Sequence, residues 1–328
     1  MADGLARWAN PSSPHAEGRA ARAALEDARM RIKAALGWRH HLLFTSGATE
    51  AIAIAIDRAD AKARSVGAVE HDAVLRVAGD ALVLPVSAEG MVRIGEVPPG
   101  ALVAVQAVNN ETGVLQPLDD IAVRVRAAGG LLMADCAQSA GKLPLPEADL
   151  IAVSAHKLGG PPGIGALLVR DLAMLRPTGG QEQGYRGGTE NVPATLGFAA
   201  ALEATAPWMD RAAMLRARLE AGVTAAGGEI VAAGSPRLPT IGSYRLPGVP
   251  AASQLIRLDM AGIAVSAGSA CSSGSVRPSH VLAAMGWDEA AAREVIRVSF
   301  GPATSVADVD RFLELWSGLA RRAPARVA

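Results

Sequence analysis

The sequence is poor in aromatic residues and in cysteine, and it has no excess of charge of either sign. Aromatic residues make up 3% of its 328 residues, whereas half of all residues are hydrophobic. This apolar fraction is too high for a chain that is mainly disordered. Lysine and arginine together number 32, as do aspartate and glutamate, so the formal net charge is zero. A zero net charge provides no electrostatic reason to expect a nucleic-acid or anionic-membrane partner.

Two cysteines, Cys136 and Cys271, are too few for a disulfide framework, and their spacing matches no metal site. The N-terminal residues lack an apolar run like that of a signal peptide. No uninterrupted apolar stretch reaches the ~18 residues that a membrane helix needs. We therefore expect a cytoplasmic protein with reduced thiols, no metal and no membrane span.

The spacing of the apolar residues predicts an α/β fold. Residues 17–36 have the periodicity of a helix, and short apolar runs then alternate with helical stretches. Strands are predicted at 41–45, 66–70, 80–86, 101–108, 130–135, 149–155 and 165–169, and helices at 48–64 and 118–129. Such alternation is typical of a mostly parallel sheet flanked by helices. From Pro207 onward shorter strands mix with helices, so we expect a large domain at 15–206 and a smaller α+β domain made of 1–14 and 207–328.

Polar residues follow five of the predicted strands, at the point where each strand ends. They are Thr45–Thr49, Glu70–His71, Asn109–Gly113, Asp135–Gln138 and Ser154–Lys157. Functional residues of open α/β sheets lie beyond the carboxyl ends of the strands. Five such ends at one edge of the sheet predict a site there.

Three of these features have a structural and a functional interpretation. Ser46–Thr49, opening a helix, could cradle a phosphate or simply be a capped turn. Asp135 ends a very apolar strand, so it either faces a positive partner such as a pyridinium nitrogen or caps a helix. Arg297 lies within the apolar run VIRVSFG and could clamp a carboxylate or form an internal salt bridge.

Lysine is scarce, with four residues against 28 arginines, and one of the four is unusually placed. Lys157 lies between apolar strands and precedes a run rich in glycine and proline. A desolvated lysine has a lowered pKa and can form a Schiff base, although a surface lysine is the alternative.

The two cysteines differ in their surroundings. Cys136 follows a buried strand and is expected to be structural packing. Cys271 lies in the run SAGSACSSGS, where it is either a reactive, accessible thiol or an incidental one.

Nine motifs in order resemble those of the cysteine desulfurases, pyridoxal-phosphate (PLP) enzymes of the class V aminotransferase group with the type I fold. They are TSGATE (45–50), EHDAV (70–74), NNETG (109–113), DCAQSAGK (135–142), SAHK (154–157), GPPGIGAL (160–167), GGQEQGYRGGTEN (179–191), AGSACSSG (267–274) and IRVSFG (296–301). The resemblance covers roughly residues 10–315. The cysteine loop resembles that of the subgroup used in iron–sulfur assembly.

The resemblance implies a role for each matching residue. Lys157 would hold PLP as a Schiff base, Asp135 would pair with the pyridine nitrogen, and His71 would stack on the ring as a catalytic residue. The other cofactor contacts would come from Gln138 to the phenolic oxygen and from Ala48, Thr49, Ser154 and His156 to the phosphate. Thr189 would reach the phosphate of the neighbouring subunit, which implies a homodimer.

The resemblance also implies the reaction. Asn110 and Arg297 would hold the carboxylate of L-cysteine, and Cys271 would accept its sulfur. The products would be L-alanine and a persulfide on Cys271, which would pass to an iron–sulfur scaffold or a thiolation enzyme.

The sequence departs from the family pattern at several positions. Members usually begin with a strand bearing Asp-Ala-Thr-Thr-Pro ahead of the segment matching Asn10–Ser12, and this chain starts after it. Gln183 stands where the family commonly has arginine, and residues 159, 162 and 187 also differ. Two alternatives therefore stay open: a selenocysteine lyase or other class V PLP lyase, and an inactive PLP-fold partner subunit.

Overall fold

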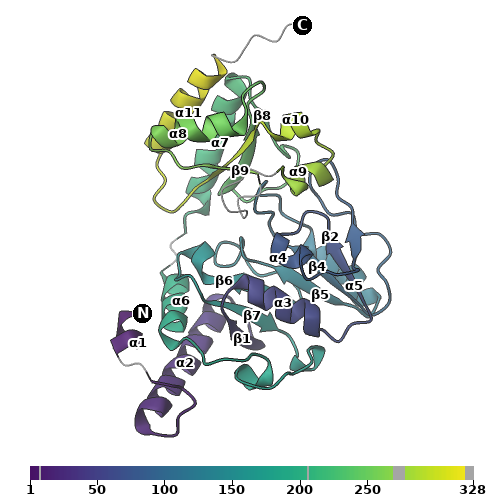
Figure 1. The fold of residues 1–328 in the computed structure, drawn as a ribbon, viewed down its shortest axis with the longest axis vertical. Helices are drawn as coiled ribbons and strands as arrows, with labels where there is room; N and C mark the ends of the chain where they lie inside the picture. The colour runs from purple at the N-terminus through teal and green to yellow at the C-terminus, as the bar shows by residue number, and fades with distance from the viewer. Residues whose placement is uncertain (7–8, 205–206, 269–277, 322–328) are drawn as a thin grey trace. The chain divides into compact units, whose positions relative to one another are not determined.

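The computed structural model describes residues 1–6, 9–204, 207–268 and 278–321. The chain folds into two compact units (Figure 1). Unit 1 comprises Met1–Leu84, Ile94–Ala107 and Gln116–Ala206, and unit 2 comprises Pro85–Arg93, Val108–Leu115 and Pro207–Ala328.

These units differ from the predicted domain boundaries in two respects. Residues 1–6 group with unit 1, because helix α1 (Ala2–Ala6) packs on helix α6 (Val192–Glu203) with Gly4 against Pro193. The segments 85–93 and 108–115 group with unit 2, although each is preceded and followed along the chain by a segment of unit 1. One of them carries Asn110, so the predicted substrate residues Asn110 and Arg297 both belong to unit 2.

Unit 1 contains a seven-stranded sheet and its helices. The strands are β1 (His41–Thr45), β2 (Ala63–Gly67), β3 (Leu82–Leu84), β4 (Ala101–Gln106), β5 (Leu131–Asp135), β6 (Leu150–Ser154) and β7 (Gly165–Val169). The helices besides α1 and α6 are α2 (Ala16–Ala35), α3 (Ala48–Arg58), α4 (Asp72–Leu75) and α5 (Leu118–Ala127), with short 3₁₀ turns at η1 (Ala155–Leu158), η2 (Leu172–Met174) and η3 (Glu182–Gly184).

The sheet order is β1-β7-β6-β5-β4-β2-β3. Only β7, among the strands of this sheet, runs against its neighbours, because the connection from β6 is too short for a crossover helix. The other six strands run in one direction, so their carboxyl ends lie at one edge. The prediction of an α/β fold with a mostly parallel sheet is confirmed.

The predicted bounds of two elements differ from those in the structure by three residues or more. The helix predicted at 48–64 ends at Arg58, where Ala59 leaves helical geometry and pairs with Leu175. The strand predicted at 66–70 is β2, three residues earlier, and it pairs with both β3 and β4. The first half of β2 therefore contains Arg64 and Ser65. These residues are polar, so a prediction based on runs of apolar residues does not include them in the strand.

Burial explains why these residues form the sheet. Strands β4, β6 and β7 are buried along their whole length, which matches their uninterrupted aliphatic sequences. Helix α3 packs on β6 and β7 through apolar residues such as Ile52 and Ile56, each about 1% exposed. Figure 1 shows α3 lying across one face of this sheet.

Unit 2 is built on a four-stranded antiparallel sheet with the order β10-β11-β9-β8. Its strands are β8 (Glu229–Ile230), β9 (Ile241–Arg245), β10 (Ser266–Ala267) and β11 (Val295–Ser299), and its helices are α7 (Met209–Ala225), α8 (Ala251–Met260), α9 (His280–Ala284), α10 (Glu289–Ala292) and α11 (Val306–Ala320). Trp316 and Tyr244 are fully buried in its core, and the Trp316 Nε1–H donates to Gln254 Oε1 at 2.9 Å.

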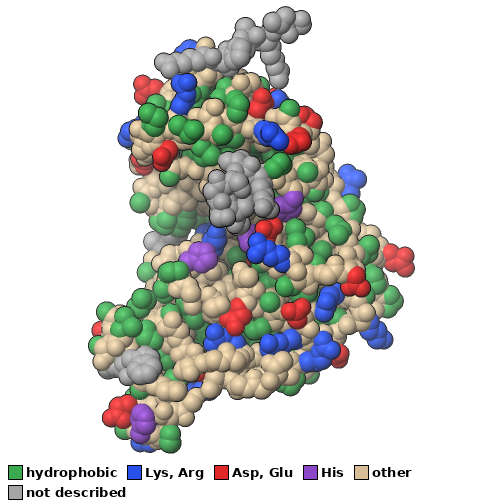
Figure 2. All heavy atoms as spheres, viewed as in Figure 1, with side chains coloured by type: hydrophobic (Ala, Val, Ile, Leu, Met, Phe, Trp, Pro, Cys, Tyr) green, Lys and Arg blue, Asp and Glu red, His purple; other side chains and the backbone are tan. Residues whose placement is uncertain are grey.

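The surface matches the balanced composition. Acidic and basic side chains are interspersed on the face drawn in Figure 2. Among the described residues, no helix combines the length and the apolar character needed to cross a membrane.

Candidate active site

The predicted phosphate cradle lies at the carboxyl edge of the unit 1 sheet, in the turn from β1 into α3. We call residues 45–49 the phosphate turn. Thr45 Oγ1 donates to the carbonyl of Gly47 at 2.9 Å, and Gly47 has no side chain to cap the first turn of α3. The start of β7 packs tightly here, because a β-carbon on Gly165 would come 2.7 Å from the Cα of Gly47.

The other predicted phosphate residues come from the end of β6. Ser154 Oγ lies 3.8 Å from the position that a β-carbon on Gly47 would occupy. The same hydroxyl is 2.8 Å from Nδ1 of His156. Burial and the charge of Lys157 lower the pKa of His156, which favours its neutral form. The structure therefore brings the Ser154–His156 pair to the phosphate turn.

Asp135 is a buried acid at this edge, at the end of β5. It is 7% exposed, and its Oδ1 accepts a hydrogen bond from the Ala137 N–H at 2.9 Å. Burial raises the pKa of Asp135, and the Ala137 N–H together with the charges of His71 and Lys157 oppose that rise. His71 and Lys157 therefore lie within electrostatic range of this carboxyl.

His71 caps helix α4, where its Nδ1 accepts a hydrogen bond from the Ala73 N–H at 3.1 Å. In the neutral ring the proton is therefore on Nε2. The preceding residue, Glu70, is fully buried. Burial raises the pKa of Glu70 well above its ordinary value, and the charge of Asp135 makes a smaller contribution in the same direction.

Lys157 lies in η1, directly beyond the end of β6, and its side chain is exposed. The expectation of a desolvated lysine is therefore wrong for this chain, because Lys157 lies three residues beyond the buried end of β6. An exposed amine at a sheet edge is open to a carbonyl compound from solution.

A second lysine at this edge was not singled out from the sequence. Lys142 Nζ donates to the carbonyl of Gln138 at 2.8 Å. Burial, with a smaller effect from the charge of Lys157, lowers the pKa of Lys142 to about 8. It lies within the quoted motif DCAQSAGK, but no spacing rule connects it to Lys157.

Cys136, which directly follows Asp135, is fully buried, as predicted for a packing residue. Cys271 falls at 269–277, outside the described residues. Among the residues that are described, no cluster of three His, Cys, Asp or Glu side chains could hold a metal ion.

Unit 2 brings together the two residues predicted to bind the substrate carboxylate. Arg297 Nη1 donates to the backbone carbonyl of Asn110 at 2.9 Å, and both residues are partly exposed. The preceding turn is shaped by Asn109, whose Oδ1 accepts from the N–H groups of Glu111 and Thr112 at 3.0 and 2.8 Å. The turn that carries Asn110 thus contributes a backbone carbonyl that orients the Arg297 guanidinium.

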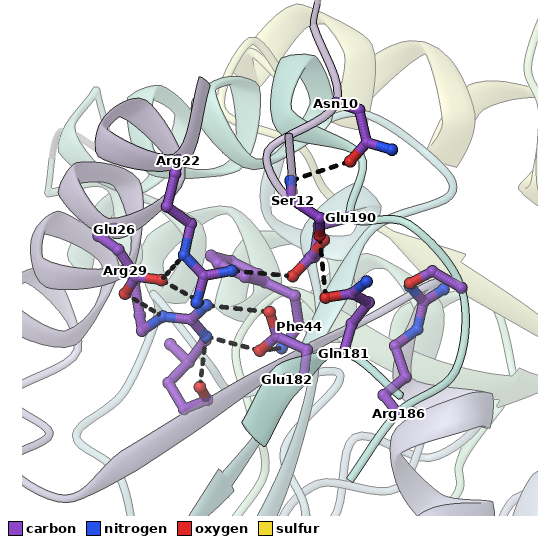
Figure 3. A network of polar contacts seen from close by, with 12 residues as sticks. Asn10, Ser12, Arg22, Glu26, Arg29, Phe44, Gln181, Glu182, Arg186 and Glu190 are labelled. Atoms are coloured by element: carbon purple, nitrogen blue, oxygen red, sulfur yellow. Dashed lines mark hydrogen bonds and ion pairs between the residues drawn. The ribbon is translucent and has the colours of Figure 1, made fainter. Parts of the chain in front are cut away.

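Thr189 lies in a glycine-rich segment of unit 1, residues 179–190, which we call the arm. The arm is held by ion pairs that no motif or spacing in the sequence indicates (Figure 3). Arg29 binds both carboxylate oxygens of the buried Glu182 at 2.6 and 2.9 Å, and Glu182 also accepts from the Phe44 N–H at 2.8 Å. Arg22 contacts Glu190 at 3.4 Å, while Thr189 itself is exposed.

Comparisons with known proteins agree on one family. The model of the aminotransferase class-V family matches residues 5–312. A cysteine desulfurase of Gluconacetobacter diazotrophicus is 37% identical over 95% of this chain and 86% of its own length. An IscS-like cysteine desulfurase of Mycobacterium tuberculosis is 35% identical over 96% of this chain and 90% of its own.

Solved structures agree with these sequences. A NifS-like protein superposes with a TM-score of 0.87 at 30% identity, covering 96% of this chain and 92% of its own. A structure of SspA in complex with cysteine has a TM-score of 0.77 at 29% identity, covering 92% of this chain and 93% of its own.

Proposed function

Because this chain belongs to the class V aminotransferase family, with cysteine desulfurases among its relatives, we propose that it is a PLP-dependent cysteine desulfurase. The observation that carries the proposal is a juxtaposition at one sheet edge. An exposed amine, Lys157, and a buried carboxyl, Asp135, lie in electrostatic range of each other beside a strand-to-helix turn without a capping side chain.

These residues fit PLP in chemical terms. The N–H groups at the start of α3, with Ser154 and His156, suit a phosphate. A buried carboxyl suits a protonated pyridine nitrogen, whose positive charge would offset the cost of burying Asp135 in its ionised form. Lys157 supplies the amine that PLP-dependent enzymes need.

Bound there, PLP would act as an electron sink for the substrate. The residues of the chain would do the rest. Asp135 would keep a proton on the pyridine nitrogen, and Gln138 would donate to the phenolic oxygen. Ala48, Thr49, Ser154 and His156 would hold the phosphate, and His71 would cover the ring. Lys157 would take the proton from the substrate Cα and return it.

Asn110, Arg297 and Cys271 would supply the substrate and sulfur contacts. Arg297, oriented by the carbonyl of Asn110, would bind the carboxylate of L-cysteine. The thiolate of Cys271 would form a bond to the substrate sulfur while the carbon–sulfur bond breaks, leaving its electron pair on carbon. Protonation of that carbon gives L-alanine, and Cys271 carries a persulfide for an iron–sulfur scaffold or a thiolation enzyme.

We also propose a homodimer, in which Thr189 reaches the phosphate of the other subunit. The support is local: Thr189 is exposed, although its neighbour Glu190 is buried and paired with Arg22. Glu190 thus anchors the end of the arm, and the exposed residues 187–189 next to it are accessible to a second subunit.

The decisive experiment compares the wild type with Lys157→Ala. The wild type should show the visible absorbance of lysine-bound PLP and release alanine and sulfide equivalents from L-cysteine. Lys157→Ala should lose both while keeping its far-UV spectrum. Absorbance that survives in Lys157→Ala would contradict the assignment of Lys157 as the PLP-binding lysine. Turnover of selenocysteine but not of cysteine would identify selenocysteine as the substrate in place of L-cysteine.

A further inference from the structure

One ion pair joins the arm to Glu50, the residue of α3 that directly follows the phosphate turn. Arg186 Nε donates to Glu50 Oε1 at 3.1 Å, and the other oxygen of Glu50 accepts a hydrogen bond from the Ser46 N–H. The side chains of Arg186 and Glu50 are 18% and 30% exposed. The two oxygens of one carboxylate therefore connect two segments that lie 136 residues apart.

Glu50 occupies a position where its charge matters. It lies in the first turn of α3, and its hydrogen bond to Ser46 shapes the turn that would receive a phosphate. Its pKa is lowered, because the hydrogen bond from Ser46 and the charge of Arg186 outweigh the effect of burial. Glu50 is therefore ionised at neutral pH, close to where a dianionic phosphate would bind, and like charges at short range repel.

Arg186 removes that repulsion. Its guanidinium bonds to the Glu50 oxygen that does not hold Ser46. The carboxylate can thus shape the turn without presenting an uncompensated negative charge. The arm's other ion pairs, Arg29 with Glu182 and Arg22 with Glu190, go to α2 instead.

We propose that Arg186 is a positioning residue for the PLP phosphate, acting by neutralising the Glu50 carboxylate that shapes the phosphate turn. This effect of Arg186 on Glu50 arises within one chain and does not depend on the proposed contact between Thr189 and the phosphate of the other subunit. The inference deepens the proposed function and rests on it for the identity of the phosphate-bearing ligand.

The experiment separates phosphate binding from all other cofactor contacts. Dissociation constants for PLP and for pyridoxal, which lacks the phosphate, are measured by visible absorbance on protein first stripped of cofactor. Arg186→Gln should weaken PLP binding by about tenfold, equivalent to 1.4 kcal/mol, and leave pyridoxal binding unchanged. Because glutamine can still accept from the Ser46 N–H, Glu50→Gln/Arg186→Gln should recover most of the PLP affinity.

The matched control is Arg31→Gln, which removes an exposed ion pair between α2 and Glu203 on α6. It should change neither constant. An equal loss for PLP and pyridoxal in Arg186→Gln, no loss for either, or a double variant as weak as Arg186→Gln would overturn the inference. A wild type that shows no lysine-bound PLP would instead overturn the proposed function.

Discussion

Cys136 should be almost inert in the folded protein. It is fully buried, its N–H donates to the Ala152 carbonyl, and its own carbonyl accepts from Ala140 at 2.9 Å. Burial, with a smaller effect from Asp135, raises the pKa of the Cys136 thiol from its ordinary value of 9.0 to about 12. At pH 8 the thiolate fraction is then about one in ten thousand instead of about one in ten. The thiolate is the reactive form, so alkylation should be slowed roughly thousandfold before steric protection is counted.

The assay is alkylation with iodoacetamide at pH 8, followed by mass spectrometry of the intact protein. The wild type and Cys136→Ser should each take up one label quickly, on Cys271, whereas Cys271→Ser should take up none until it is unfolded in urea. Cys136→Ser should also lose about 1–3 kcal/mol of stability if its hydroxyl finds no partner. In the proposed reaction the extra sulfur should appear on Cys271 and turnover should survive in Cys136→Ser.

Native Cys271→Ser that is labelled within tenfold of the wild-type rate would refute the reasoning about burial. Sulfur recovered on Cys136 after incubation with L-cysteine would refute the assignment of the acceptor. The two results are independent, because the first tests the packing behind β5 and the second tests the chemistry.

Three further predictions follow from particular contacts. Arg29→Met should destabilise unit 1 by about 3–5 kcal/mol in urea titrations, because it leaves the buried Glu182 carboxylate without its cation; Arg29→Met/Glu182→Met should recover part of the loss. The lowered pKa of Lys142 means that the unfolded chain binds more protons between pH 8 and 10.5, so stability should rise with pH there. Lys142→Met should abolish a rise on the order of 2 kcal/mol, and an unchanged slope would contradict the burial of this amine. Light scattering should give about twice 33.5 kDa for the wild type, and a monomer that still holds PLP would contradict the dimer.

Much of unit 1 could be predicted because hydrophobic periodicity reports burial directly. β4, β6 and β7 are buried on both faces and read as continuous apolar runs, so their positions were predicted to within two residues. The range predicted for β2 starts three residues too late, because Arg64 and Ser65 interrupt the apolar pattern. The backbone pairing of β2 with β4 does not depend on these side chains, so the strand includes them. The end of α3 was also missed, because an alanine-rich stretch keeps a helical pattern beyond the residue where tertiary pairing ends it.

The sequence by itself determined which ends of the strands in unit 1 carry polar residues. The direction of a strand decides which of its ends carries the polar residue, so the sequence pattern alone assigns Asp135 and Lys157 to one edge of the sheet. The tertiary structure alone decided how exposed Lys157 is and which charges pair. Arg29 meets Glu182 across 153 residues and Arg186 meets Glu50 across 136, in a chain with 32 basic and 32 acidic residues. Charge has no period along the chain, so many pairings look equally good in the sequence, and only the packing of α2, α3 and the arm selects these.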